Sequence, residues 1–526
     1  MIRWRFSTDG STTSEGWYVD DISITHVYQQ RACIGTPGDV QALTATAVSG
    51  TGKVKLEWVY PAGVSQAMLR YAAGSTPPAT TADGILISTE SGTAGAYDSY
   101  EHSGLTPGNT YSYTAFAYNG STYASGRPVT ARPFSTPAAV KWAYSTGAAA
   151  LTPPGVEPGA LHEGAVFAVS NDRVLHSTNT SASGGDWPRT APFDWEPMAM
   201  NAPSQARPGL ALNSAVTGAD ELIAFVGTQD GCVYAIRAED GFVEWERDLS
   251  AAPHNAEMIQ APIAAMYKDY GGDHDLVFAA TRNAISANKI FALDPDDGTV
   301  LWSFDNGASG TPANTMGIIS GGMYVDYANN RLYFASRSRG GGSSQTLWCL
   351  NFTADTASLA YSADVGDVDG SPVISGGRIY VGNNDGVVYA RNMDLTAIWQ
   401  HALAGDTSAV KAYVFPEWTA STPRRLFLST SNNVWMLTDQ GGSCSAASPV
   451  AVAEASTPLY RLGTNYLYVG STLGRLYQIN VSTWASSSVT LGDGTAKVGS
   501  PSFDVVNGLL YVGTDDGRVY AVSVPW

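Results

Sequence analysis

Short hydrophobic runs, joined in pairs by tight polar turns, recur from residue 135 to the end of the chain. The clearest pairs occupy residues 224–236, 379–391, 467–479 and 509–522. Each has a run ending in Val-Gly, a turn of small polar residues such as Asn-Asn-Asp-Gly, and a second run with a tyrosine near its centre. Alternating runs around such turns predict β-hairpins.

The hairpin recurs eight times when degenerate copies beginning at residues 166, 276, 332 and 426 are included. The spacing is roughly 40 to 60 residues, which is room for about four short strands per repeat. No long run with helical periodicity is present, so a helical solenoid is excluded. The large apolar residues that align the copies are Leu175, Tyr234, Phe291, Trp348, Tyr389, Trp435, Tyr477 and Tyr520.

Two further strands complete each repeat. A small residue followed by proline precedes several hairpins, where proline is tolerated at the start of a strand. An Asp/Gly turn and a tryptophan-bearing run follow several others, with Trp245, Trp302 and Trp399 at the same place in each repeat. The predicted fold is therefore all-β, with an eight-bladed β-propeller of four strands per blade. The proline pairs are Ala261-Pro262, Ser371-Pro372, Thr457-Pro458 and Ser500-Pro501.

The last repeat ends at Trp526 without a tryptophan-bearing strand. A matching run, residues 139–145 with Trp142, lies just before the first repeat. We expect this strand to pair with residues 518–522 and so to close the ring, which would leave no exposed edge in that blade.

The N-terminal quarter has a different pattern. In residues 37–134 an alternating run places Val54, Leu56 and Trp58 on one face. The stretch Leu105-Thr106-Pro107-Gly108 before Tyr111 resembles the tyrosine corner of fibronectin type III domains. This resemblance implies a β-sandwich without catalytic residues over residues 37–134. The repeats described above place the propeller over residues 135–526.

Residues 1–36 are expected to be a short β segment and a linker. Residues 16–24, GWYVDDISI, resemble the closing strand of β-sandwich domains in secreted bacterial proteins. Two strands alone are marginally stable in water. We therefore expect the sequence to lack the true N-terminus, and the missing part could include a catalytic domain.

The propeller repeat resembles that of quinoproteins. Phe291-Ala292-Leu293-Asp294, Gly298 and Trp302 match that repeat most fully. The resemblance implies the propeller fold, which serves both quinone-dependent dehydrogenases and non-catalytic scaffolds such as the outer-membrane assembly lipoprotein. In the dehydrogenases the site holds pyrroloquinoline quinone and calcium, often beneath a disulfide between adjacent cysteines. The cysteines here, Cys33, Cys232, Cys349 and Cys444, are far apart, and the site residues of those enzymes find no match.

Composition narrows the class of partner. Only 14% of the residues are charged, and 29 basic against 47 acidic residues give a net charge of -18, which disfavours nucleic acid. No apolar run is long enough for a transmembrane helix. An acidic chain rich in Ser and Thr, with these domain types, suggests an exported protein that is extracellular or on the cell surface.

Few residues suggest a site. Asp364, Asp367 and Asp369 are spaced so that a turn could present them to calcium, although a polar loop is the more ordinary interpretation. No other cofactor is expected. Trp142, Trp245, Trp302 and Trp399 recur with the repeat, which indicates packing between blades. Trp187 lies in an irregular segment, and Arg337 and Arg339 lie in a long insertion, so these three are the candidate contact residues.

These patterns predict a non-catalytic binding or scaffold protein that contacts a protein or a glycan through the rim loops of the propeller, with self-assembly as a further expectation. Two alternatives stay open. The chain could be the C-terminal accessory part of a larger secreted enzyme such as a peptidase, or it could be a quinoprotein oxidoreductase. No residue is predicted to be catalytic.

Overall fold

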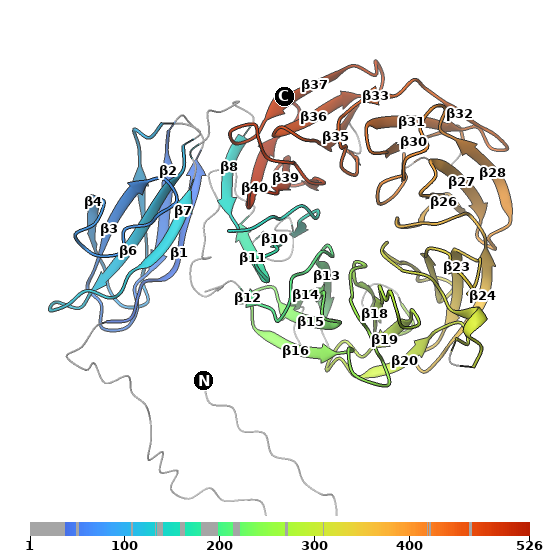
Figure 1. Ribbon diagram of the computed structural model, residues 1–526, viewed down its shortest axis with the longest axis horizontal. Coiled ribbons are helices and arrows are strands. Elements are labelled where there is room, and N and C mark those ends of the chain that lie inside the picture. Colours follow the sequence, from blue (N-terminus) through green and yellow to red (C-terminus); the bar gives the residue numbers. More distant parts are fainter. Residues whose placement is uncertain are drawn as a thin grey trace, which may run out of the picture.

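The computed structural model describes residues 37–48, 52–106, 109–131, 133, 140–157, 164–179, 198–213, 221–268, 272–308, 310–417, 419, 422–461 and 465–526. These residues form a ring of β-sheets with a β-sandwich beside it (Figure 1). The expected all-β class is confirmed, since the described helical structure is a single 3-10 turn, Pro312–Asn314. The predicted segment 1–36 and Trp187 lie outside the described residues.

Eight sheets make up the ring, each antiparallel and mostly of four strands. The inner strands begin next to the ring axis, and the chain then runs outward through each sheet. From the inner to the outer strand, sheet 1 is β9 (Gly155–Glu157), β10 (Ala165–Val169), β11 (Val174–Asn179) and β12 (Met198–Ala199); sheet 2 is β13 (Gly209–Asn213), β14 (Glu221–Gly227), β15 (Cys232–Arg237) and β16 (Val243–Asp248); sheet 3 is β17 (Ala264–Met266), β18 (Leu276–Ala280), β19 (Ile290–Leu293) and β20 (Val300–Phe304); sheet 4 is β21 (Tyr324–Asp326), β22 (Arg331–Ala335), β23 (Leu347–Phe352) and β24 (Ala357–Ala363).

The second half of the ring follows the same order. Sheet 5 is β25 (Val373–Ser375), β26 (Arg378–Gly382), β27 (Val387–Asn392) and β28 (Ala397–Ala402); sheet 6 is β29 (Phe415–Pro416), β30 (Arg424–Ser429) and β31 (Asn433–Asp439), with β32 (Cys444–Ala446) and β33 (Val450–Ala451) both paired to β31; sheet 7 is β34 (Leu459–Tyr460), β35 (Tyr466–Gly470), β36 (Arg475–Asn480) and β37 (Ser486–Thr490); sheet 8 is β38 (Ser502–Asp504), β39 (Leu509–Thr514), β40 (Arg518–Ser523) and β8 (Val140–Ser145).

Sheet 8 joins the two ends of the propeller sequence. Strand β8 pairs antiparallel with β40, with Ala143 opposite Tyr520 and Trp142 opposite Ala521. The last strand of the chain is therefore covered on its outer side by a strand that precedes the first repeat (Figure 1). This pairing removes the free edge that β40 would otherwise present.

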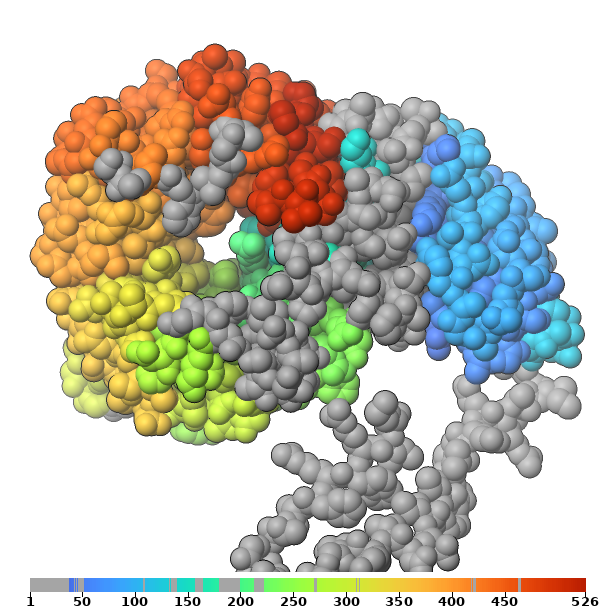
Figure 2. Space-filling model, turned by 180° about the vertical axis from the view of Figure 1, so that it is seen from behind, coloured from blue at the N-terminus to red at the C-terminus, as the bar shows by residue number. Residues whose placement is uncertain are grey.

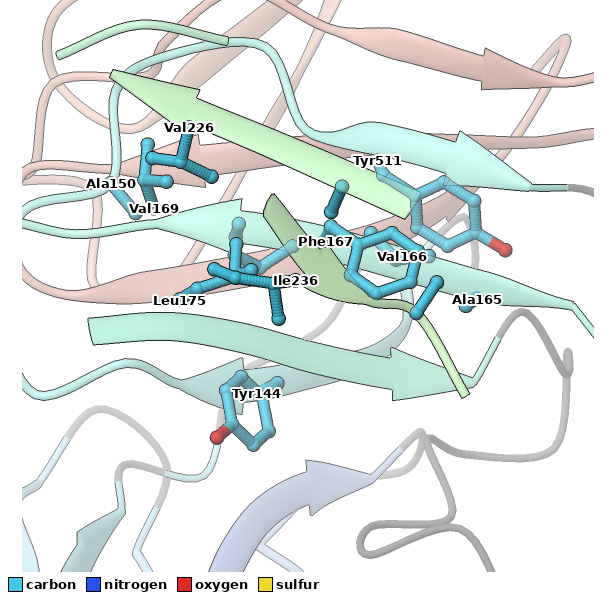
Figure 3. Packing of buried hydrophobic residues seen from close by; sticks show 14 of the residues in the cluster. Tyr144, Ala150, Ala165, Val166, Phe167, Val169, Leu175, Val226, Ile236 and Tyr511 are labelled. Atoms are coloured by element: carbon cyan, nitrogen blue, oxygen red, sulfur yellow. The ribbon is translucent and has the colours of Figure 1, made fainter. Parts of the chain in front are cut away.

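The hydrophobic core lies between neighbouring sheets. One cluster joins Phe167 and Leu175 of sheet 1 to Ile236 of sheet 2 and to Tyr511 of sheet 8 (Figure 3). All four side chains are at most 1% exposed. Because each sheet buries both of its faces against its neighbours, the central strands are hydrophobic at nearly every position, as in β10 and β18.

The sandwich consists of two sheets with a buried core that includes Leu56, Trp58 and Tyr113. Tyr111 supports the chain before it, because its hydroxyl accepts a hydrogen bond from the Thr106 backbone N–H at 2.9 Å. In sheet order, one sheet is β1 (Gln41–Val48), β2 (Val54–Val59) and β5 (Tyr97–His102), and the other is β4 (Ile85–Ser91), β3 (Gln66–Ala73), β6 (Tyr111–Tyr118) and β7 (Arg127–Ala131).

The sandwich and the ring share a continuous sheet, which the sequence patterns did not predict. Strand β1 pairs antiparallel with β8, with Ala47 opposite Ala143 and Val48 opposite Trp142. The resulting sheet of seven strands runs in the order β38-β39-β40-β8-β1-β2-β5. Backbone pairing therefore links the two parts of the molecule directly.

Candidate functional site

The candidate site lies at one end of the ring. Because the strands of each sheet alternate in direction, the inner strand begins at the same end as the turn between the second and third strands. We call this end the loop face. The longest described turns between the second and third strands are residues 281–289 of sheet 3 and residues 336–346 of sheet 4.

The turn 281–289 is held by buried asparagines. The Asn288 side-chain oxygen accepts hydrogen bonds from the Thr281 hydroxyl and the Asn283 backbone N–H. The Asn288 side-chain amide donates to the carbonyls of Asn283 and Met316. Buried amides with several partners fix a loop in one conformation, because breaking the network would leave polar groups unpaired.

Glu257 fixes the tip of the same turn. Its carboxylate accepts hydrogen bonds from the backbone N–H groups of Ala284, Ile285 and Ser286 at 2.7, 2.9 and 2.7 Å. Burial by itself would raise the pKa of Glu257. The backbone hydrogen bonds lower the pKa by more than burial raises it, so that the pKa of Glu257 lies below the ordinary value of 4.5. The tip is thereby held around a charged group, and the Ile285 side chain stands 84% exposed.

The two candidate contact arginines hold loops together. The Arg339 guanidinium donates to the carbonyls of Ile285 and Ser286 at 2.5 and 2.7 Å, which ties the turn of sheet 4 to that of sheet 3. Arg337 donates to both carboxylate oxygens of Asp369 at 2.7 and 2.5 Å, and this pairing raises the pKa of Arg337. Arg337 nevertheless keeps 38% of its side chain exposed.

The three candidate calcium ligands are not brought together as a cation site. Asp369 pairs with Arg337, whereas Asp367 accepts hydrogen bonds from the backbone N–H and the hydroxyl of Ser338. Asp364 accepts a hydrogen bond from the Gly366 N–H. Within the described ranges no three His, Cys, Asp or Glu side chains are grouped so that they could hold a metal ion. The Asp spacing instead builds loop structure.

The repeat tryptophans lie in the hydrophobic clusters between neighbouring sheets. Trp142, Trp245, Trp302 and Trp399 are all at most 8% exposed. The Trp245 indole N–H donates to the Pro295 carbonyl of the next sheet at 2.7 Å, and Trp302 donates in the same way to Thr353 at 3.2 Å. These side chains therefore attach each sheet to the next and are not exposed for a ligand.

An axial cavity of about 550 Å³ opens on the loop face, and the space-filling view shows the molecule open at the centre of the ring (Figure 2). Arg207, Asp369 and Tyr413 line it together with small polar residues and prolines. Sequence reasoning missed this cavity as a site. The pairs of a small residue and proline, which the sequence pattern indicates as starts of inner strands, are the sequence signal for the wall of this cavity.

The lining of the axial cavity does not suit pyrroloquinoline quinone with calcium. Asp369 is its one carboxylate among the described residues, and Arg337 occupies both oxygens of that carboxylate. No indole of the described residues lines the cavity to stack on a quinone ring, and the described cysteines, Cys232, Cys349 and Cys444, are free thiols outside it. The described lining therefore offers neither the set of carboxylate ligands that calcium prefers nor an aromatic surface for stacking a quinone.

Comparisons with known proteins agree with the ring of sheets. The model of the family described as outer membrane protein assembly factor BamB matches residues 181–437 and 286–525, together more than half of the chain. A search of curated proteins finds no match. In the part of the chain that the structure describes, no helix is long and apolar enough to cross a membrane.

Two solved structures are similar at low identity. BamB from Moraxella catarrhalis aligns at 16% identity over 70% of this chain and 96% of its own, with a TM-score of 0.48. Quinohemoprotein alcohol dehydrogenase from Comamonas testosteroni aligns at 14% identity over 74% of this chain and 77% of its own, with a TM-score of 0.53. At such identity the second likeness shows a shared fold and carries no activity.

Proposed function

The chain belongs to the family of the outer membrane protein assembly factor BamB, and we propose on this premise that it is a non-catalytic scaffold that binds another protein through the loop face of its propeller. The proposed setting is the cell surface or the space outside the cell. The family description concerns assembly of other proteins, which favours binding over chemistry.

The observation that carries this proposal is the presentation of Ile285. A large apolar side chain that is 84% exposed normally belongs to a flexible surface loop. Here hydrogen bonds hold the backbone around Ile285 in place. They come from Asn283 and Asn288 of the same turn, from Glu257, and from Arg339 of the neighbouring sheet. A rigid loop loses little conformational entropy on binding, so burying Ile285 in a partner would be efficient.

Charge around Ile285 indicates the character of the partner. Arg282, Lys289 and Arg339 lie on the same two turns, beside Arg337, which is already paired with Asp369, in a chain whose net charge is -18. The Arg282 Nε is buried and has no hydrogen-bond partner among the described residues. We therefore expect the partner surface to combine an apolar pocket with acidic groups.

The sandwich is proposed to be a fibronectin type III domain that positions the propeller. Its order of strands, with β1-β2-β5 in one sheet and β4-β3-β6-β7 in the other, and the Tyr111 hydroxyl contact support this assignment. The pairing of β1 with β8 would transmit the orientation of the sandwich to the ring without a flexible joint. In a longer chain this arrangement would set the distance to whatever precedes the sandwich.

The test is site-specific photo-crosslinking in the native cell envelope or secreted fraction. A photoreactive amino acid replaces Ile285 in one variant and Val505 in a control, because Val505 is 73% exposed but lies in the turn of sheet 8 at the opposite end of the ring. We expect a discrete adduct with one protein from position 285 and none from position 505. Equal labelling from both positions, or none from either, would contradict a binding surface on the loop face.

A second variant, Ile285→Asp, separates contact from folding. It should abolish the adduct formed by a crosslinker placed at the neighbouring Ala284, while hydrogen exchange of residues 281–289 stays slow because the Glu257 and Asn288 hydrogen bonds remain. An adduct that persists in Ile285→Asp would show that the isoleucine is not the contact.

A further inference from the structure

One residue from each sheet lines the axial cavity at the same structural position, two residues before the inner strand begins. We call this set the ring position. Most members are small, cyclic or hydroxyl-bearing, as is expected where eight strand starts crowd around one axis. In chain order the members are Pro153, Arg207, Pro262, Gly322, Ser371, Tyr413, Thr457 and Ser500.

The inner ends of neighbouring sheets are closely packed. A Cβ on Gly370 would stand 2.3 Å from the Ala412 carbonyl oxygen, and the Ser371 N–H donates to that same carbonyl. Ser371 in turn accepts a hydrogen bond from the Gly322 N–H through its hydroxyl at 2.6 Å. The wall of the cavity is therefore rigid, and large side chains at the ring position must point into the open space.

Arg207 and Tyr413 are the two exceptions to small ring-position residues. They come from sheets 2 and 6, which lie on opposite sides of the ring (Figure 1). Arg207 is exposed and has no ion pair or hydrogen bond of its side chain within the described part of the chain. Arg207 and Tyr413 line the same axial cavity. Burial raises the pKa of Tyr413, while the positive charge of Arg207 acts to lower it.

A second cavity of about 500 Å³ adjoins the first and shares Leu151, Ala412, Thr457 and Ser500 with it. It adds Lys411 and Lys497, of which Lys497 pairs with Glu454 at 2.8 Å. The Lys411 ammonium makes no hydrogen bond or ion pair with its side chain within the described residues, but its charge acts on the Glu454 carboxylate. Arg337 neutralises Asp369, and the described cations Arg207, Lys411 and Lys497 share the single remaining carboxylate, Glu454, so the joined cavities carry an excess of positive charge.

We propose that the axial cavity binds a small carboxylate-bearing ligand, with the Arg207 guanidinium pairing with the carboxylate and the Tyr413 hydroxyl donating to it from the opposite side. The planar guanidinium fits a carboxylate through two parallel hydrogen bonds. The apolar lining from Leu151, Pro153, Pro262 and Met323 suits the carbon skeleton of an organic acid better than inorganic phosphate. The proposed ligand contacts, Arg207 and Tyr413, lie outside the turns of sheets 3 and 4 that are proposed to bind a protein.

Ligand-observed NMR and calorimetry on the full chain test the proposal with four probes: citrate, galacturonate, glucose and inorganic phosphate. At least one carboxylate should bind at millimolar concentration or below, whereas glucose should not. Arg207→Gln should weaken that binding at least about tenfold, and Tyr413→Phe should weaken it severalfold. Arg475→Gln, an exposed arginine outside both cavities, is the matched control and should change nothing.

Three results would overturn the site: no carboxylate binds, the carboxylate binds equally well to Arg207→Gln, or phosphate binds as tightly as every carboxylate. Arg207→Lys keeps the charge and should bind with intermediate affinity, which guards against misfolding of Arg207→Gln. Ile285→Asp should leave carboxylate binding unchanged, so a failure of the protein-binding role and a failure of this site are distinguishable.

Discussion

At the residue level, the buried carboxylate of Asp406 organises the surrounding loop. Asp406, in the loop between β28 and β29, is 8% exposed and accepts hydrogen bonds from Ser408, Thr430, Asn433 and the Trp435 indole. It lies within a polar loop whose composition gives no hint of this role. It is important because donors from four residues, in sheet 6 and in its own loop, converge on one carboxylate.

Asp406 predicts an acid-dependent loss of stability. Burial raises its pKa, but the hydroxyls of Ser408 and Thr430 and the amide of Asn433 lower it well below 3.8. A carboxyl with a depressed folded pKa stabilises the fold above its unfolded pKa, and this contribution disappears as the pH falls through the folded value. Asp406→Asn should therefore lower the free energy of unfolding by about 2–3 kcal/mol at pH 7.

Denaturant titrations of the wild type and Asp406→Asn between pH 3 and pH 7 measure this effect. The difference between the two proteins should narrow below pH 4, where the carboxylate of the unfolded wild type becomes protonated. A difference that stays constant over this range would mean that the charge of Asp406 does not stabilise the fold.

At the scale of elements, the junctions between neighbouring sheets differ in the group that accepts the hydrogen bond of the tryptophan indole N–H. The Trp302 indole N–H donates to the backbone carbonyl of Thr353, an exposed residue in a turn. The Trp399 indole N–H instead donates to the carboxylate of the fully buried Asp439 at 2.9 Å. Asp439 also pairs with Arg378 and accepts from the Tyr380 hydroxyl. The same sequence signal therefore produces two junctions with different energetics.

This difference predicts unequal costs for the same substitution. Trp302→Phe and Trp399→Phe remove the same ring area from positions of nearly equal burial, 7% and 8%. Water can replace the lost donor at the exposed Thr353 turn but not at buried Asp439, so Trp399→Phe should cost about 1–2 kcal/mol more. Equilibrium unfolding of both variants measures this, and an equal or larger loss in Trp302→Phe would contradict it.

At the scale of the whole molecule, the first and last strands of the propeller hold each other. Strand β40 is paired on both sides, with Val512 and Ala143 opposite Tyr520. Strand β8 is also paired on both sides, because β1 of the sandwich covers its outer edge. Ring closure and the attachment of the sandwich therefore depend on the same short stretch of backbone.

Tyr520→Pro should open this closure. Proline removes the N–H at a doubly paired strand position and should lower the free energy of unfolding by about 3 kcal/mol or more. Freed strand edges favour self-association, so oligomers should appear in size-exclusion chromatography. Tyr520→Phe keeps the backbone and the ring and is the control; equal melting temperatures for the two variants would show that the closure contributes little.

Local sequence patterns are enough to predict the repeated hairpins, the tryptophan-bearing strands and the resemblance of residue 140 onward to an outer strand, because alternation and turn chemistry act within a few residues. Long-range contacts, which appear only in the folded chain, let Glu257 and Arg339 fix the turn carrying Ile285, pair Asp369 with Arg337, and extend the sheet of β8 with β1. The same geometry brings Arg207 and Tyr413 to the wall of one axial cavity. These partners are distant in sequence, and ring geometry, which no local pattern encodes, brings them together.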